Sequence, residues 1–179
     1  MKRLLLLSGP MASGKTSVAV ALQEGYGFVP ISSSTFLRAQ LAARNMPADR
    51  QSLQELGDCL DKVSDFSWLI NSVASPVIVA QPHIDNWLLD AVRKPRQVEQ
   101  FKLQFAGLVR HVHITASESV LQQRYAERGA ANLAQYRAAV LHPNEQSARS
   151  LAGLADQVLD IEAFTPLEIA DHILSAWEK

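Results

Sequence analysis

The sequence has little cysteine, no long apolar run and no excess of charge of either sign. The single cysteine among 179 residues, Cys59, excludes an internal disulfide and fits a reducing compartment. No stretch of about 18 apolar residues is present, so we expect no membrane-spanning helix. The 17 basic and 18 acidic residues leave a net charge of −1, which lacks the basic excess of a dedicated nucleic-acid binder but leaves a local basic patch open. We expect a cytoplasmic protein without a membrane partner, and the sequence leaves open whether it forms a homodimer.

Short apolar runs alternate with segments of helical periodicity along the whole chain. Apolar residues make up 47% of the sequence, which suits one domain with a sizeable core, so residues 1–179 are treated as a single domain. The alternation predicts an α/β fold with a mainly parallel sheet covered by helices on both faces. The expected strands are 3–8, 28–31, 87–92, 112–116 and 158–161. The expected helices are 14–23, 36–43, 52–59, 97–105, 118–128, 133–141, 144–154 and 166–177, with one more that starts at Asp65 and is disturbed at Pro76.

Residues 9–16 read GPMASGKT, a complete G-x-x-x-x-G-K-[ST] phosphate-binding motif. The motif follows the first expected strand and precedes the first expected helix, which is the context in which it works. Backbone N–H groups and the helix N-terminus attract phosphate oxygens, Lys15 would reach the β- and γ-phosphates, and the Thr16 hydroxyl would hold Mg²⁺. The alternative is a glycine-rich turn with a surface lysine. We expect ATP and Mg²⁺ as cofactors, with the nucleotide held by Gly9, Ala12, Ser13, Gly14, Lys15, Thr16 and Ser17.

Four later stretches narrow the reaction, because a phosphate loop alone specifies only a nucleotide. The first two are 31–38 (ISSSTFLR) and 49–58 (DRQSLQELGD). The third, 87–95 (WLLDAVRKP), is an apolar strand that ends in Asp90, and ligands of open parallel sheets bind beyond the carboxyl ends of strands. The fourth, 121–129 (LQQRYAERG), places two arginines four residues apart on one helix face.

Together with the phosphate loop, these stretches resemble the nucleoside-monophosphate kinase branch of the P-loop proteins, which includes adenylate kinase, dephospho-coenzyme A kinase and the phage deoxynucleoside-monophosphate kinases. The resemblance spans nearly the whole chain. It implies a three-layer α/β/α fold with a five-stranded sheet, an acceptor-binding helical region at about 32–85 and a small helical lid at about 125–143. It also implies ATP-dependent phosphoryl transfer to a nucleoside or deoxynucleoside monophosphate, a small-molecule partner.

The resemblance also implies which side chains act. A guanidinium fork matches phosphate oxygens, and the residues implied to bind the acceptor are Ser33, Arg38, Arg50, Gln54 and Arg93. Asp90 would orient Mg²⁺ through water or accept the proton of an attacking hydroxyl, so the implied metal site is Thr16 and Asp90. Arginines of the lid would stabilise the transferred phosphoryl group, so the implied catalytic residues are Lys15, Asp90, Arg124 and Arg128. The loop 161–164 would line the base pocket.

Each of these assignments has a structural alternative. The first stretch could be a plain helix cap, the second an amphipathic helix that packs its leucines, and the fourth a solvated charged face. Asp90 could form a structural salt bridge with Arg93 or Lys94. His111 and His113 alternate along a strand without a third metal ligand at suitable spacing, so we interpret them as structural or surface residues. Cys59 is expected at a buried or half-buried helix position.

Two other functions stay open at this point. One is a P-loop kinase that acts on a non-nucleotide hydroxyl or on a modified base in DNA, for which the arginines at positions 38 and 93 would lose their phosphate partner. The other is a regulatory nucleotide-binding NTPase without an acceptor. The chain has no N-K-x-D motif, the base-recognition signature of GTPases. No signature of the acceptor base can be read, and the segment 65–85 is longer than the resemblance predicts.

Overall fold

A computed structural model describes residues 2–127 and 133–177, and it has a five-stranded sheet in the order β2–β3–β1–β4–β5. All four strand pairings are parallel, which confirms the predicted α/β fold. The strands are β1 (Arg3–Ser8), β2 (Val29–Pro30), β3 (Asn86–Leu89), β4 (Val109–Thr115) and β5 (Gln157–Asp160). The helices are α1 (Lys15–Tyr26), α2 (Ser33–Ala42), α3 (Arg50–Val63), α4 (Ser75–Ala80), α5 (Pro95–Gln104), α6 (Glu118–Glu127), α7 (Leu133–Val140), α8 (Pro143–Ser150) and α9 (Pro166–Ser175), with a π-helical turn η1 (Leu69–Ala74) and a 3₁₀ turn η2 (Leu151–Leu154).

The run of four leucines in β1 is explained by the central place of this strand. β1 pairs with β3 on one side and with β4 on the other. Leu4, Leu5, Leu6 and Leu7 are all fully buried. A strand in the middle of a parallel sheet is covered on both faces, so both of its alternating sets of side chains must be apolar.

Two hydrophobic cores lie on opposite faces of the sheet, as the alternation along β1 dictates. Leu5 and Leu7 belong to the core that α1 and α9 cover, together with Leu22 and Ile173. Leu4 and Leu6 belong to the other core, which also takes Leu37, Leu56, Leu69, Phe101 and Leu151 from α2, α3, η1, α5 and η2. The result is the three-layer arrangement predicted from the sequence.

The segment between α3 and β3 differs from the predicted helix. Asp65 and Phe66 adopt left-handed backbone angles, with φ of 47° and 63°, so no helix begins there. Helical structure starts at Leu69 with η1 and continues as α4. Pro76 lies in the first turn of α4, where its missing N–H is tolerated, and does not disturb the helix. Because η1 buries most of its side chains, the segment forms part of the core beneath α2 and α3.

Two smaller differences concern single elements. β3 ends at Leu89, before the predicted end at Val92, because the chain turns away from the sheet directly after the buried Leu89. Cys59 is exposed on α3, which corrects the expected burial. In the described part of the chain, no helix is long and apolar enough to cross a membrane.

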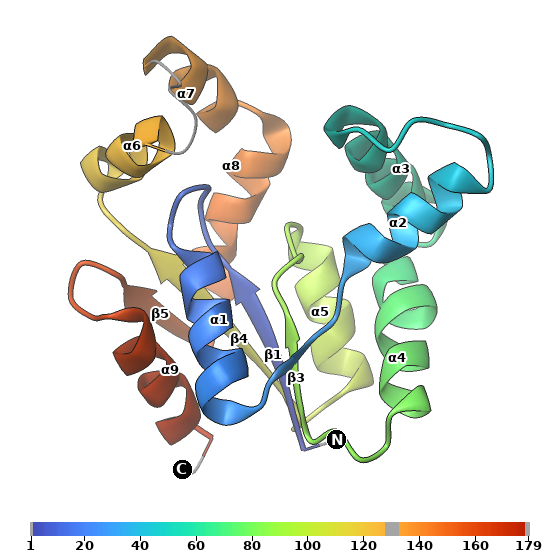
Figure 1. The fold of residues 1–179 in the computed structure, drawn as a ribbon, viewed down its shortest axis with the longest axis horizontal. Coiled ribbons are helices and arrows are strands. Elements are labelled where there is room, and N and C mark those ends of the chain that lie inside the picture. The colour runs from blue at the N-terminus through green and yellow to red at the C-terminus, as the bar shows by residue number, and fades with distance from the viewer. Residues whose placement is uncertain (1, 128–132, 178–179) are drawn as a thin grey trace.

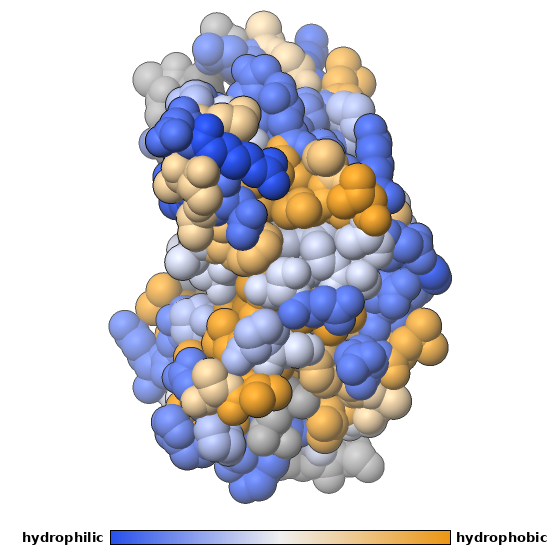
Figure 2. Space-filling model, turned by 90° about the vertical axis from the view of Figure 1, so that its right-hand side faces the viewer, coloured by the Kyte–Doolittle hydropathy of each residue, from blue (hydrophilic) through white to orange (hydrophobic). Residues whose placement is uncertain are grey.

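Two groups of helices stand above the carboxyl edge of the sheet (Figure 1). Helices α6, α7 and α8 lie on one side, α2 and α3 lie on the other, and the loop between β1 and α1 lies beneath α6, α7 and α8. Figure 2 shows the side of the molecule formed by α2, α3 and α4, where hydrophilic residues break the hydrophobic ones into separate patches. The arrangement places residues from distant parts of the sequence around one central loop.

Candidate active site

The phosphate loop leaves β1 and enters α1, which is the strand–loop–helix context that the motif requires. A Cβ atom on Gly9 would lie 2.3 Å from the carbonyl oxygen of Ile114 in β4, so only glycine fits this close approach. Gly14 precedes α1 with φ of 83°, and Ala12 also has a left-handed φ of 64°. The sheet thus holds the loop in a tight curve with the N-terminus of α1 at its end.

Lys15 lies folded over this loop. Its Nζ donates to the carbonyl oxygens of Gly9 and Pro10, at 2.7 Å each, and lies 3.5 Å from the hydroxyl oxygen of the buried Ser13. Thr16 and Ser17 follow on the first turn of α1, and both are exposed. An ammonium group and two hydroxyls therefore surround the mouth of the loop, which suits the phosphate and metal roles implied for them.

A cleft of about 310 Å³, called the transfer cleft, opens above the carboxyl ends of β1 and β3. This is where the strand order reverses, because the chain passes from β3 across β1 to β4, and such switch points bind ligands in open α/β sheets. Asp90, exposed directly after β3, lies in the cleft opposite the loop. The transfer cleft is lined by Gly9, Lys15, Asp90, Arg93, Tyr125 and Glu145, among others.

A second pocket of about 470 Å³, called the nucleoside pocket, adjoins the loop on the side of α6 and β5. Arg124 lies over the start of α1, since its Nη1 would be 3.3 Å from a Cβ on Gly14. Ile161 and Phe164 line the same pocket, as expected for the loop that follows the last strand. Glu127 accepts a hydrogen bond from Gln123. Arg128 lies outside the described residues.

The third pocket, of about 350 Å³, is called the acceptor pocket and lies between α2, α3 and the segment that follows β3. All of the residues predicted to bind the acceptor line it: Ser33, Arg38, Arg50, Gln54 and Arg93. Three of these also line the transfer cleft, namely Arg50, Gln54 and Arg93, so the two spaces share a wall. Arg38 donates to the carbonyl oxygen of Ala48 at 3.2 Å, which ties α2 to the start of α3.

An acidic and basic cluster in the acceptor pocket was not predicted. Lys94 Nζ donates to Asp58 Oδ1 at 2.9 Å, and lies 4.0 Å from the buried Asp61. Asp61 Oδ1 accepts from Trp68 Nε1 at 2.8 Å and from Gln97 Nε2 at 2.9 Å. Asp58 ends the second stretch quoted above, so it could have been singled out. Asp61 could not, because its partners come from two other segments, Trp68 before η1 and Lys94 and Gln97 at the start of α5.

Asp90 does not form the structural salt bridge with Arg93 or Lys94 that was the alternative to a functional role. Lys94 pairs with Asp58, and within the described ranges the Asp90 carboxylate makes no hydrogen bond or ion pair. The same holds for the guanidinium groups of Arg50 and Arg93, although both are exposed to solvent in the pockets. All three groups are exposed to solvent, and no bond within the described protein would have to break before they meet a ligand.

A buried cluster of Ser8, His111 and His113 supports the base of the phosphate loop. Ser8 Oγ lies 2.7 Å from His111 Nε2 and 2.9 Å from His113 Nδ1. One hydroxyl can donate to one ring and accept from the other only if the two rings offer one acceptor and one N–H, which suits two neutral imidazoles. The structural interpretation of these histidines therefore holds, and neither lies on the surface. No group of three or more potential metal-binding side chains occurs in residues 2–127 and 133–177.

The histidine cluster predicts that the protein loses stability as the pH falls from about 6.5 to 4. Burial lowers the pKa of His111 to about 4, and burial with the charges of His111 and Lys15 lowers the pKa of His113 to about 4. Between these values and 6.5 the unfolded chain binds protons that the folded chain does not, so the free energy of unfolding falls with falling pH. The loss approaches about 3 kcal/mol for each histidine at pH 4.

Urea unfolding at half-unit steps from pH 7 to pH 4.5 measures this loss. His113→Gln should flatten the dependence, because one of the two depressed groups is gone, whereas the exposed His83→Gln should leave it unchanged. Equal slopes in the wild type and His113→Gln would show that burial does not lower the pKa of His113.

The residues around the loop fit a magnesium ion bound with a nucleotide. Mg²⁺ is commonly held by one or two protein oxygens together with phosphate oxygens and water, and it needs no cage of protein ligands. The exposed Thr16 hydroxyl and the unpaired Asp90 carboxylate supply oxygens of this kind at the loop and at the adjacent strand end.

Comparison with known proteins agrees with this geometry. A family model described as an AAA domain matches residues 5–141 of the chain. The chain matches no curated protein. Among solved structures, the tunicamycin resistance protein of Deinococcus radiodurans is similar with a TM-score of 0.65 and 16% identity, over 98% of this chain and 95% of that one.

Two solved kinases are similar over almost their whole length. The APS kinase of Mycobacterium tuberculosis, in complex with AMPPNP and APS, has a TM-score of 0.58 and 17% identity, over 99% of this chain and 98% of that one. A gluconokinase from Sinorhizobium meliloti 1021 has a TM-score of 0.54 and 17% identity, over 99% and 92% of the two chains. At such low identity the likeness shows the fold alone, which is a P-loop kinase-like fold. Neither kinase is named for a nucleoside monophosphate.

Proposed function

The chain belongs to the AAA domain family. From that premise we propose that it transfers the γ-phosphoryl group of ATP to a small anionic acceptor, and that this acceptor is a nucleoside or deoxynucleoside monophosphate. The observation that carries the proposal is the pair Arg50 and Arg93. Both guanidinium groups lack a side-chain partner in the described part of the chain, and both line the acceptor pocket and the transfer cleft at once.

The nucleotide end of the proposal rests on the phosphate loop and its surroundings. The loop N–H groups and the N-terminus of α1 would hold the phosphates, with Lys15 at the β- and γ-phosphates. Arg124 lies where it would meet the triphosphate between loop and nucleoside pocket. Thr16 and Asp90 would hold Mg²⁺, which when bound would neutralise charge on the phosphate oxygens.

The acceptor end rests on the charges in its pocket. Arg50 and Arg93 would bind the anionic group of the acceptor beside the transfer cleft, and Gln54 would hydrogen-bond it. An acceptor oxygen then attacks the γ-phosphorus, the bond from that phosphorus to the β–γ bridging oxygen breaks, and ADP leaves. Asp90 would orient the attacking oxygen or the metal's water shell. Such transfer needs little beyond positioning and charge stabilisation.

A second candidate is a kinase for a hydroxyl group on an anionic metabolite. It is favoured by the solved kinases of this fold, which include a gluconokinase and an APS kinase. The paired Asp58 and Lys94 in the acceptor pocket could hydrogen-bond hydroxyl groups. Arg50 and Arg93 would still meet an anionic group, so both candidates use the same charged wall. A nucleic-acid acceptor and a regulatory NTPase without an acceptor have no such observation in their favour.

A panel of acceptors tests the proposal. Thermal shifts are measured for nucleoside and deoxynucleoside monophosphates, gluconate and APS, each with Mg²⁺ and AMPPNP, because a ligand of the folded state raises the melting temperature. One nucleoside monophosphate should give the largest shift and should accept label from labelled ATP. Arg93→Ala should weaken that acceptor roughly 10- to 100-fold, since it removes a charged hydrogen bond.

Arg96→Ala is the matched control, because Arg96 pairs with Asp65 and Glu99 on the surface and lines no pocket described above. A shift and label transfer with gluconate or APS alone would favour the second candidate. Slow ATP hydrolysis that no acceptor stimulates would instead indicate a regulatory NTPase.

A further inference from the structure

The first turn of α8 contacts both the phosphate loop and the acceptor helix α3. This turn comprises His142, Pro143, Asn144 and Glu145, and is called the α8 turn. The kinase chemistry proposed above uses none of these side chains. Three of them nevertheless make hydrogen bonds to elements that lie on opposite sides of the transfer cleft.

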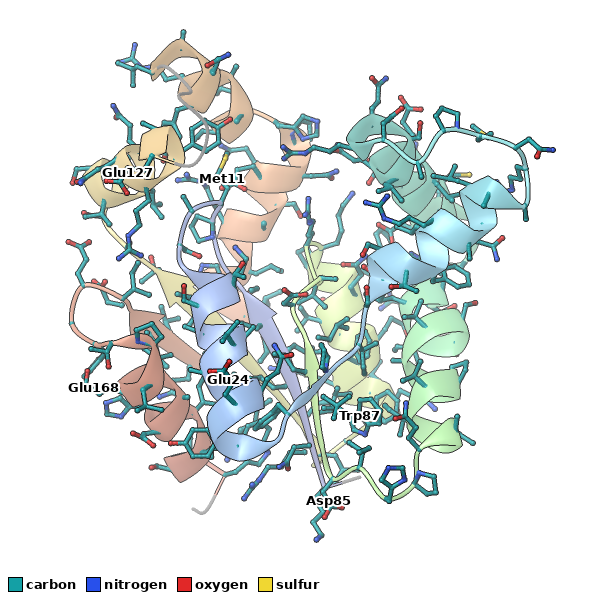
Figure 3. All side chains as sticks on the ribbon, viewed as in Figure 1. Met11, Glu24, Asp85, Trp87, Glu127 and Glu168 are labelled. Atoms are coloured by element: carbon teal, nitrogen blue, oxygen red, sulfur yellow. The ribbon has the colours of Figure 1, made fainter. Side chains whose placement is uncertain are left out.

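Glu145 binds the phosphate loop directly. Its Oε1 accepts from the backbone N–H of Met11 at 2.9 Å. Figure 3 labels Met11 at the tip of the loop, beneath α6, α7 and α8. The carboxylate is mostly buried, with 13% of its side chain exposed, and Arg149 Nε donates to the same oxygen at 3.0 Å. The hydrogen bond from Arg149 fixes the position of this carboxylate, so the carboxylate can in turn hold the N–H of Met11 in place.

Arg149 anchors this carboxylate to the rest of the helical group. Its Nη1 donates to Glu118 of α6 at 2.8 Å, and its Nη2 to the hydroxyl of Tyr136 in α7 at 3.3 Å. Tyr136 donates in turn to Glu118 at 2.6 Å. Through Arg149 and Glu145, helices α6, α7 and α8 are therefore tied to the tip of the phosphate loop.

His142 and Asn144 reach the other side of the cleft. His142 Nε2 lies 3.0 Å from the side-chain amide of Gln54, and Asn144 Nδ2 donates to Asp58 Oδ2 at 3.4 Å. His142 Nδ1 lies 3.2 Å from the backbone nitrogen of Asn144, and the ring nitrogen that faces α3 is Nε2, opposite Gln54 Nε2.

We propose that the α8 turn is the positioning element that links the phosphate loop to the acceptor helix, with Glu145 as its positioning residue. The proposal rests on the proposed function for the identity of the two ends. Glu145 fixes the tip of the loop, while His142 and Asn144 fix α3, whose Gln54 faces both the acceptor pocket and the transfer cleft. The position of a nucleotide on the loop is thereby fixed relative to that of an acceptor bound against α3, on the other side of the cleft.

The Glu145 contact is tested by exchange at the Met11 amide and by AMPPNP affinity. Glu145→Ala should speed hydrogen exchange at Met11 roughly tenfold and raise the Kd for Mg²⁺ and AMPPNP by a similar factor, because the backbone N–H of Met11 loses the carboxylate that accepts its hydrogen bond. Glu145→Gln should stay within about threefold of the wild type, because its amide oxygen can still accept from Met11. Gln146→Ala is the control, since the Gln146 side chain donates to the carbonyl oxygen of Val140, on its own side of the cleft, and the substitution leaves the backbone unchanged.

Wild-type exchange at Met11 together with wild-type affinity in folded Glu145→Ala would overturn the proposal. A wild type that does not bind AMPPNP would instead remove the proposed function, and exchange at Met11 would still decide whether Glu145 holds the loop. The two failures are therefore distinguishable.

The link to α3 is tested by exchange along that helix. Adding Mg²⁺ and AMPPNP to the wild type should slow amide exchange in residues 57–63, which form the C-terminal half of α3. The double variant His142→Ala, Asn144→Ala should bind AMPPNP but lose this slowing. Equal slowing in the double variant, or none in the wild type, would overturn the link. Should the double variant not fold, Gln54→Ala removes the bond to His142 from the side of α3 and should reduce the slowing.

Discussion

Replacing Lys15 by alanine should lower the rate of phosphoryl transfer by at least roughly a thousandfold while the protein stays folded. The ammonium group lies at the mouth of the phosphate loop, beside the proposed site of the β- and γ-phosphates. Negative charge builds up on the β–γ bridging oxygen as ADP leaves, and in the variant the backbone N–H groups, Mg²⁺ and Arg124 would have to stabilise it without the ammonium group. The bonds that Lys15 makes to the carbonyls of Gly9 and Pro10 are only partly buried, so their loss should cost about 1 kcal/mol of stability.

Label transfer from ATP measures the activity, and circular dichroism with thermal unfolding checks the fold. Lys62→Ala serves as the control, because Lys62 is an exposed lysine in the last turn of α3. It should keep wild-type activity. Folded Lys15→Ala with wild-type turnover would remove the assignment of the active site.

The variant Asp90→Asn should lower turnover by roughly 10²- to 10⁴-fold, with little change in stability. Asp90 lies at the carboxyl end of β3, opposite the loop. Within the described part of the protein its carboxylate makes no hydrogen bond or ion pair, so the substitution removes no stabilising contact. Asparagine keeps the shape but can neither take a proton nor carry the negative charge that attracts Mg²⁺.

The dependence of turnover on Mg²⁺ concentration and on pH distinguishes the two roles proposed for Asp90. If its carboxylate holds the water shell of Mg²⁺, Asp90→Asn should need more Mg²⁺ and regain part of its activity at high concentration. If it accepts the proton of the acceptor, Mg²⁺ should not help and the acidic limb of the pH–rate profile should vanish. Asp85→Asn, at the other end of β3 and paired with Lys2, is the control. Unchanged turnover in Asp90→Asn would place the reaction elsewhere.

Local patterns were enough to predict the sheet and the strand–loop–helix unit that carries the phosphate-binding motif. Four consecutive apolar residues followed by a phosphate-binding motif specify a buried strand, a loop and a helix, and β1 and α1 occur where they were predicted. Asp90 could be placed at the strand end because a buried run stops there. Such inferences need only neighbours in sequence.

The contacts between distant segments could not be predicted in the same way. Asp61 owes its burial to Trp68 and Gln97, and the bond between Glu145 and Met11 spans 134 positions of the chain. The turn at Asp65 and Phe66 was missed because no glycine or asparagine marks it: aspartate adopts a left-handed backbone more readily than most residues, but phenylalanine rarely does. In each case the tertiary packing decides, and a single sequence holds no record of it.

The acceptor helices are inserted between two strands that lie side by side, β2 and β3, which pair at Val29 with Trp87 and at Pro30 with Leu88. The segment between β2 and β3 could therefore be replaced in evolution while the sheet and the phosphate loop stay unchanged. One ancestral fold could in this way come to accept many substrates. A replacement segment would still have to present counterparts of Gln54 and Asp58, the two side chains through which the α8 turn engages it.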